Sequence, residues 1–298
     1  MSDEPSASKR DRRLPGLSAR TALYGFLGLS LGSVLAGRRR TGRQRAQLVE
    51  ELQETASERP VGTVTPEDYA DLPDPVRRYF ETVLEPGQSH IRTARLKQRG
   101  EFRLGDSESA WHPLQATQHY AVSPPGFVWD ATIRLGSVLP TQVVDSYVDG
   151  IPTLSARLLW TVPVADAAPT PELAAGELSR YLAEAVWFPT ALLPTNGVEW
   201  EPVDDDAARA TLTHGGTTVS LVFHFDEANL VDRVVAENRF RAVGDGFERS
   251  KWTGRFADYE RRDGMLVPTS AEVEWNLPSG DLPYWRGRIT RFEFDLGE

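Results

Sequence analysis

The feature that most constrains the fold is one helix-forming stretch, residues 169–194, set between two long regions of strand-like sequence. Thr170 is a suitable N-cap, Pro171 suits the first helical position, and Pro189 ends the helix, which is predicted over residues 171–188. At 3.6 residues per turn one helix face is apolar, made of Ala174, Leu178, Tyr181, Leu182 and Ala185. That face requires a sheet to cover it.

On both sides of this helix, apolar residues recur at every second position, the pattern of a half-buried strand. Turn signals such as Asp149-Gly150 and Asp263-Gly264 separate the segments. The pattern predicts an α+β, mainly antiparallel fold, a curved sheet or unclosed barrel of ~10–12 strands wrapped around the central helix. The predicted strands are 91–104, 110–122, 126–135, 141–149, 151–162, 198–203, 207–214, 217–225, 230–242, 251–262, 265–277 and 285–296.

Four segments are predicted along the chain. Residues 1–20 form a basic disordered tail, residues 21–37 a transmembrane anchor, and residues 38–65 a stalk and linker. A single β-rich domain occupies residues 66–298. It opens with a short second helix whose N-cap we predict at Asp74.

The apolar run 21–37 has no charged residue and would extend about 26 Å as a helix, within the lower range for a membrane span. Two alternatives are a signal peptide ending at residues 34–36 and a twin-arginine signal starting at Arg12-Arg13. The residues after the run resist translocation and favour a cytoplasmic body, because they include Arg38, Arg39, Arg40, Arg43 and Arg45. The tail before the run is basic too, so an extracytoplasmic body stays open.

Composition excludes several classes of function. The net charge of −10 and the pI near 5.1 argue against a general nucleic-acid binder, because the basic excess is confined to the N-terminal region. Without cysteine there is no thiolate nucleophile and no cysteine-ligated metal site. The five histidines show no metal-ligand spacing. We therefore predict no metal and no cofactor.

A polar stripe follows the side of the central helix opposite the apolar face. Glu177, Arg180, Glu184 and Trp187 are spaced by three, four and three residues, which places an arginine between two carboxylates beside an indole. Exposed helices carry such ion-pair ladders routinely, so a solvated ladder is the default interpretation. If the stripe is buried, it becomes a candidate ligand-binding site.

Aromatic residues and the charged residues next to them cluster near two predicted turns. They supply the other candidate ligand contacts: Trp129, Asp130, Tyr284, Trp285 and Arg286. Packing between sheet and helix is the competing interpretation of these aromatic residues. Arg180, Arg286 and Arg288 suit a phosphate or carboxylate head group. Asp130, Glu177 and Glu184 are the carboxylates placed beside apolar neighbours that would raise their pKa values, as acid–base chemistry requires.

Several blocks resemble a widespread family of uncharacterised prokaryotic proteins, known as a domain of unknown function. They are GELSRYLAEAVWFPTALLP (176–194), LPDPVRRYF (72–80), PPGFVWDA (124–131), WEPVDDDAARATL (200–212) and LPYWRGRI (282–289). The resemblance covers roughly residues 66–298 and implies no activity. More distantly, the succession of hairpins ending in 259–275 is similar to periplasmic lipoprotein carriers, which implies an unclosed barrel whose apolar face holds acyl chains.

Three hypotheses follow. The leading one is a membrane-anchored, non-enzymatic protein that binds a lipid or other amphiphile in an apolar concavity of the curved sheet. The second is a hydrolase-like enzyme that uses Asp130 or the Glu177/Glu184 pair, which raised carboxylate pKa values in one cleft would favour. The third is a filled barrel that acts as an interaction module, which a fully packed interior would favour.

Overall fold

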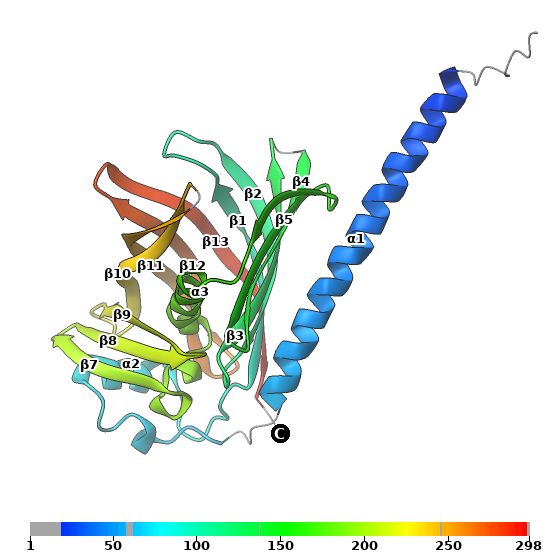
Figure 1. Ribbon diagram of the computed structural model, residues 1–298. Coiled ribbons are helices and arrows are strands. Elements are labelled where there is room, and N and C mark those ends of the chain that lie inside the picture. The colour runs from blue at the N-terminus through cyan, green and yellow to red at the C-terminus, as the bar shows by residue number, and fades with distance from the viewer. Residues whose placement is uncertain (1–18, 58–61, 137, 245, 297–298) are drawn as a thin grey trace, which may run out of the picture.

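A computed structural model describes residues 19–57, 62–136, 138–244 and 246–296, with side chains described from Ser33 onward (Figure 1). The first 18 residues of the predicted tail lie outside the described part. The helices are α1 (Ala19–Ser57), α2 (Asp74–Val83) and α3 (Pro171–Glu184). The strands are β1 (Thr93–Arg103), β2 (Trp111–Ala121), β3 (Gly126–Leu135), β4 (Leu139–Val148), β5 (Ile151–Leu158), β6 (Val162–Ala167), β7 (Val198–Asp204), β8 (Ala207–His214), β9 (Thr217–Phe225), β10 (Val231–Val243), β11 (Gly246–Arg262), β12 (Met265–Leu277) and β13 (Gly280–Asp295).

All the strands belong to one antiparallel sheet, in the order β6-β5-β4-β3-β2-β1-β13-β12-β11-β10-β9-β8-β7. Each strand pairs with the next strand in the chain, except that β6 and β7 do not pair. β1 also pairs with β13, which joins the two halves. The sheet curves around α3 and leaves β6 and β7 as unpaired edges (Figure 1). The predicted mainly antiparallel, unclosed curved sheet is thus confirmed.

The sheet has 13 strands, so the predicted number was too low. The missed strand is β6, an edge strand whose first five residues are all exposed, so that it shows no alternation of buried and exposed positions. β11 and β13 also begin about five residues earlier than predicted. The first residues of both strands lie outside the buried core. No alternation of buried and exposed positions therefore marks them in the sequence.

The helix α3 begins as predicted, because the Thr170 hydroxyl accepts a hydrogen bond from the Leu173 amide at 3.2 Å. Its end differs from the prediction: the α-helix stops at Glu184 and a 3₁₀ turn covers Ala185–Trp187. The ring of Pro189 would clash with the carbonyl four residues earlier in an α-helix, so the last turn tightens before it.

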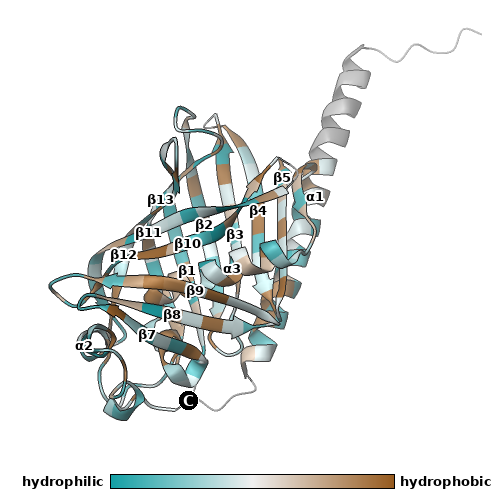
Figure 2. Ribbon diagram, turned by 60° about the vertical axis from the view of Figure 1, so that its left-hand side comes forward, coloured by the Kyte–Doolittle hydropathy of each residue, from teal (hydrophilic) through white to brown (hydrophobic). Residues whose placement is uncertain are grey.

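The helix α1 packs on the outer face of the sheet. Leu52 and Ala56 are buried against Val128, Val144 and Val148 of β3 and β4. These outward-facing apolar residues form a second, smaller core, and Figure 2 shows the hydrophobic positions on the strands that α1 covers. Within the residues described, no helix holds a stretch both long and apolar enough to cross a membrane.

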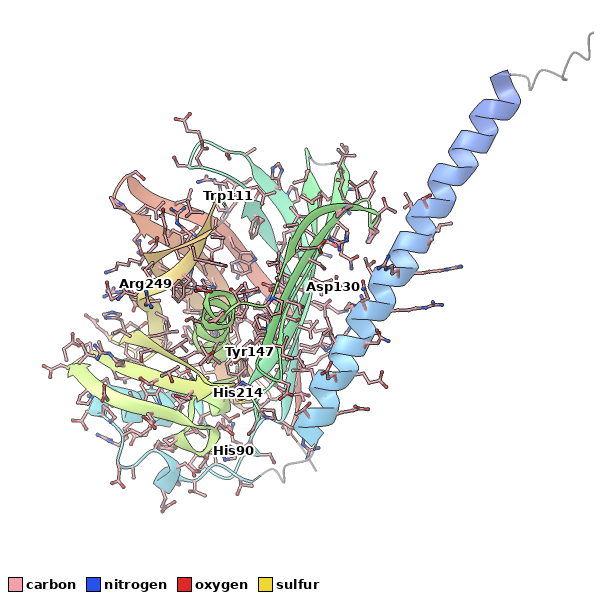
Figure 3. All side chains as sticks on the ribbon, viewed as in Figure 1. His90, Trp111, Asp130, Tyr147, His214 and Arg249 are labelled. Atoms are coloured by element: carbon pink, nitrogen blue, oxygen red, sulfur yellow. The ribbon has the colours of Figure 1, made fainter. Side chains whose placement is uncertain are left out.

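The two halves of the sheet touch at one end without strand pairing. The turn after β4 contains Gly150 and the turn after β8 contains Gly215, and both glycines have positive φ. A Cβ on Gly215 would lie 2.9 Å from the Gly150 Cα. The Tyr147 hydroxyl also donates to the His214 carbonyl at 3.3 Å, and the two side chains lie together at this end (Figure 3). We call this contact the closed end of the sheet.

The close approach at the closed end makes Gly215 sensitive to a single methyl group. We expect Gly215→Ala to lower the free energy of unfolding by ~1–3 kcal/mol more than Gly216→Ala. Both glycines have positive φ, so both variants carry similar backbone strain, but a Cβ on Gly216 meets nothing within 4 Å. Urea denaturation of the two variants measures the difference. Equal destabilisation would show that the two turns separate freely.

Candidate ligand-binding cavity

A cavity of about 360 Å³ lies between α3 and the inner face of the sheet. Most of its wall is apolar and comes from both halves of the sheet, including Phe102, Ile133, Val143, Leu154, Phe256 and Val273. Strand parity produces this wall, since alternate residues of each strand point inward. The volume lies in the range of ~300–1,000 Å³ that is usual for small-molecule sites.

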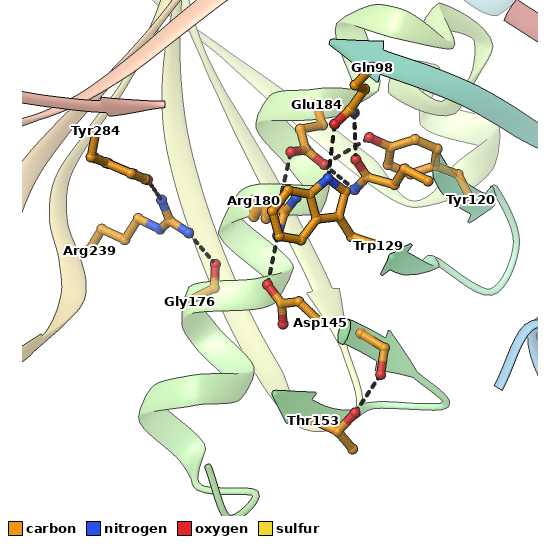
Figure 4. Close-up of polar contacts among 12 residues, drawn as sticks. Gln98, Tyr120, Trp129, Asp145, Thr153, Gly176, Arg180, Glu184, Arg239 and Tyr284 are labelled. Carbon is orange, nitrogen blue, oxygen red and sulfur yellow. Dashed lines mark hydrogen bonds and ion pairs between the residues drawn. The ribbon is translucent and has the colours of Figure 1, made fainter. Parts of the chain in front are cut away.

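Arg180 of α3 lies at the polar side of the cavity. Its Nη1 donates to Asp145 Oδ2 of β4 at 2.7 Å, and its Nε donates to Glu184 Oε1 at 2.8 Å (Figure 4). The guanidinium also lies 4.9 Å from the ring centroids of Phe127 and Trp129. Burial alone would lower the pKa of Arg180, but the carboxylates around it raise that pKa, so the side chain is a permanent cation.

Glu184 is fixed by β2 as well as by Arg180. Its Oε2 accepts from Gln118 Nε2 at 2.8 Å and from the Tyr120 hydroxyl at 2.9 Å. Gln98 extends the network, since it donates to Gln118 at 2.9 Å and accepts from the Trp129 indole at 2.9 Å (Figure 4). Both Glu184 oxygens therefore have partners, and this carboxylate positions Arg180.

A second arginine, the half-buried Arg239 of β10, lies on the other side of α3. Its guanidinium is 4.9 Å from the Trp252 ring and 5.5 Å from the Trp275 ring. It donates to the Gly176 carbonyl at 3.2 Å and lies 3.4 Å from the Tyr284 hydroxyl (Figure 4). The Tyr284 hydroxyl also accepts from the Trp252 indole. We refer to Asp145, Glu177, Arg180, Glu184 and Arg239 as the polar floor of the cavity.

Five buried polar atoms of the cavity lining have no hydrogen-bond partner among the described residues. They are the carboxyl oxygens Asp145 Oδ1 and Glu177 Oε2, the donors Arg239 Nε and the Trp187 indole N–H, and the Thr141 hydroxyl, which can donate or accept. An unpaired polar atom in an apolar interior is unfavourable by ~1–3 kcal/mol. These five atoms are the groups of the cavity that have bonding capacity left for a ligand.

The carboxyls of the polar floor have shifted pKa values. Burial, followed by the charge of Asp145, raises the pKa of Glu177 to about 8, although Arg180 and Arg239 oppose the rise. Burial raises the pKa of Asp145 to about 6, against the influence of Arg180. At neutral pH Glu177 therefore holds a proton, and the charges of the two arginines balance those of Asp145 and Glu184.

The structure brings most of the sequence-predicted site residues together. Seven line the cavity: Trp129, Glu177, Arg180, Glu184, Trp187, Tyr284 and Trp285. The stripe on α3 is buried, with Glu177 only 6% exposed and Trp187 only 2%, so it is not a solvated ladder. Tyr284 and Trp285 both face inward because a β-bulge between β12 and β13 shifts the register there.

Two predicted residues lie outside the cavity. Asp130 follows the inward Trp129 and so points to the outer face, where Arg45 of α1 binds it at 2.7 Å (Figure 3). Arg286 follows the inward Trp285 and forms an ion pair with Glu101 at 2.6 Å. Arg288 likewise pairs with Asp258 at 3.1 Å. None of these three contributes to the polar floor.

Sequence reasoning missed Asp145 and Arg239. Asp145 lies between Val143 and Tyr147 at alternate positions of β4, so all three side chains face inward. A charged residue in this apolar series could have identified Asp145 as a site residue. Arg239 had no such signal, because the register shifts between Ala236 and Arg239 and reverses the parity of the strand.

The raised pKa of Glu177 gives a pH-dependent stability. The folded protein keeps a proton on Glu177 that the unfolded chain releases above about 4.5, so this group lowers the free energy of unfolding as pH rises to about 8. We expect Glu177→Gln to remove this fall, so that the variant gains stability relative to the wild type between pH 5 and 8. Urea denaturation across that range measures it.

The matched control is Glu199→Gln, which changes an exposed glutamate on β7. It should follow the wild-type profile, including the smaller fall below pH 6 that Asp145 contributes in both chains. A Glu177→Gln profile parallel to that of the wild type would show that Glu177 is ionised in the folded protein.

No curated protein matches this chain. The crystal structure of a LolA superfamily protein from Nitrosomonas europaea is similar, with 12% sequence identity, coverage of 78% of this chain and 94% of that chain, and a TM-score of 0.36. Residues 70–294 match a family of unknown function, DUF6920, and the chain belongs to that family.

Proposed function

We propose that this protein is a membrane-anchored, non-enzymatic binder of a lipid or similar amphiphile. The observation that carries the proposal is the cavity itself, which has an apolar wall and five buried polar atoms with bonding capacity left. The apolar part of the ligand lies against the wall formed by residues such as Ile133 and Val273. Its polar end meets the polar floor.

The polar floor selects the chemistry of the polar end. With Glu177 protonated, the floor carries no net charge. It offers a donor on Arg239, an acceptor on Asp145 and a Glu177 carboxyl that can donate or accept, and the Trp187 indole beside it adds a second donor. A ligand group that both donates and accepts hydrogen bonds satisfies these atoms. Arg180 and Glu184 hold the geometry, because their hydrogen bonds join α3 to β2 and β4.

The anchor in this proposal is the uncharged run 21–37, and the arginines after it favour a cytoplasmic body. Residues 1–20 are the proposed tail, residues 38–65 the proposed stalk and linker, and residues 66–298 the proposed β-rich domain.

A second candidate is a hydrolase-like enzyme. Glu177 and Asp145 have raised pKa values in one cavity, which is the property expected of general acids and bases. Against it, the cavity lining among the described residues includes no serine, cysteine or histidine. Asp130 faces away from the cavity, and Glu184 uses both oxygens for internal bonds. Ester and glycoside hydrolysis that depends on Glu177, and is lost in Glu177→Gln, would support the enzyme over the binder.

A chain of residues 38–298, purified without detergent and extracted with solvent, tests the binder directly. We expect a stoichiometric lipid by native mass spectrometry of the protein and by analysis of the extract. This chain keeps the part of α1 that packs on the sheet, including Leu52. A protein that carries no lipid, even after incubation with host lipids, would contradict the proposal.

A cavity-filling variant tests the location. Ala271 of β12 lines the cavity, whereas Ala257 of the adjacent β11 is exposed on the opposite face. We expect Ala271→Phe to lower lipid affinity ~10-fold or more, equivalent to about 1.4 kcal/mol, and Ala257→Phe to leave it unchanged. Lipid retention in native mass spectra measures both. Full retention by Ala271→Phe would place the ligand elsewhere.

A further inference from the structure

Five hairpin turns lie together at the end of the sheet opposite the closed end. The register places the turns β1–β2, β3–β4, β5–β6, β10–β11 and β12–β13 at this end, because the strands on either side of each turn pair in order around the sheet. We call these turns and the residues that flank them the open rim. Figure 1 shows it as the upper edge of the sheet.

Exposed large hydrophobic side chains are concentrated on the open rim. Of the ten found among the described residues, seven lie there: Leu104, Val138, Leu139, Val162, Val164, Val243 and Phe247. Val138 is 76% exposed. Leu104 and Val164 also line the cavity, so the cavity reaches the surface at this rim. A gathering of exposed apolar side chains around the mouth of an apolar cavity indicates an interaction surface.

The helix α1 passes the open rim and continues beyond it. Gly37 lies against the β5–β6 turn, where an added Cβ would be 2.4 Å from the Trp160 carbonyl oxygen. The Arg38 guanidinium lies 5.2 Å from the Trp160 ring. From Gly37 the helix runs back to Ala19, about 27 Å at 1.5 Å per residue, on the far side of the rim (Figure 1). The uncharged run 21–37 therefore projects away from the rim.

A cationic cluster lies where α1 meets the rim. Arg38, Arg39, Arg40 and Arg43 are exposed on the helix turns that begin at Gly37. The order along α1 is thus an uncharged run, then a cluster of arginines, then the part packed on the sheet. This order matches a lipid bilayer, whose hydrocarbon core is bounded by anionic head groups. A second copy docked rim to rim would point its α1 in the opposite direction, so both runs could not enter one membrane.

We propose that the open rim docks on the surface of an anionic lipid bilayer, held there by α1, so that the cavity opens into the head-group layer. The inference rests on the proposed function for its anchor and its amphiphilic cargo, and it adds the surface by which that cargo enters. The rim side chains insert among the lipid head groups. An amphiphile then passes between bilayer and cavity with its apolar part out of water.

The test uses the full chain in vesicles of phosphatidylglycerol and phosphatidylcholine. Because the protein has no cysteine, single cysteines introduced as Val138→Cys and Val162→Cys carry an environment-sensitive fluorophore at one place each. Both valines are exposed on the rim and neither lines the cavity. Ile151→Cys is the control, since Ile151 is 55% exposed at the start of β5, away from the rim. We expect blue-shifted emission and quenching by spin-labelled lipids at both rim positions, at a depth of ~5–10 Å, and neither effect at Ile151.

Rim labels that spin-labelled lipids do not quench would overturn the docking, as would equal quenching at Ile151. A blue shift without lipid quenching would show that the rim contacts another protein or a second copy instead, and would also overturn it. Two rim positions guard against a local effect of either substitution. The failure of the docking and the failure of the proposed function are distinguishable. Quenched rim labels on a protein that carries no lipid would support the docking and contradict the lipid-binding function. Unquenched rim labels on a lipid-loaded protein would support the lipid-binding function and contradict the docking.

Discussion

The interaction on which the interior depends is the ion pair of Arg180 with Asp145 and Glu184. It joins α3 to β4 directly and to β2 through the bonds that Glu184 accepts from Gln118 and Tyr120. Removing one partner of a buried ion pair costs ~3–5 kcal/mol, because the other charge is left unpaired. The helix is therefore held in one rotation about its axis, with its polar stripe toward the cavity and Leu178 and Leu182 in the core.

The position of α3 also determines which part of the space inside the curved sheet is not filled by side chains. Trp187 stacks edge-on against Phe256 at 5.9 Å and lies 6.3 Å from Trp285, which closes one side of the cavity. At the closed end, Gly150 and Gly215 bring the two halves into contact, and the Tyr147 hydroxyl donates to the His214 carbonyl there. The remaining space lies between these two contacts and the open rim, so the shape of the cavity follows from packing at its boundaries.

Local sequence patterns were enough to predict the antiparallel sheet and the start of α3, because alternation and capping are properties of neighbouring residues. They were not enough where both faces of a strand are exposed, as in the edge strand β6. The site residues also differ in whether the sequence predicts them. Glu177, Arg180 and Glu184 lie on one helix stripe that their spacing reveals. Arg239 faces inward only because of a β-bulge. A bulge depends on the pairing of two strands, which one strand's sequence does not show.

Proton binding and ligand binding are coupled at Glu177. In the folded protein its carboxyl is neutral below about pH 8, and its Oε2 has no partner among the described residues. A ligand that donates a hydrogen bond to this carboxyl stabilises its ionised form and lowers its pKa, whereas a ligand that accepts from it stabilises the protonated form. By linkage, the first kind binds more tightly as pH rises through 8 and the second kind more weakly. The pH dependence of binding therefore reports which polar group the ligand presents to α3.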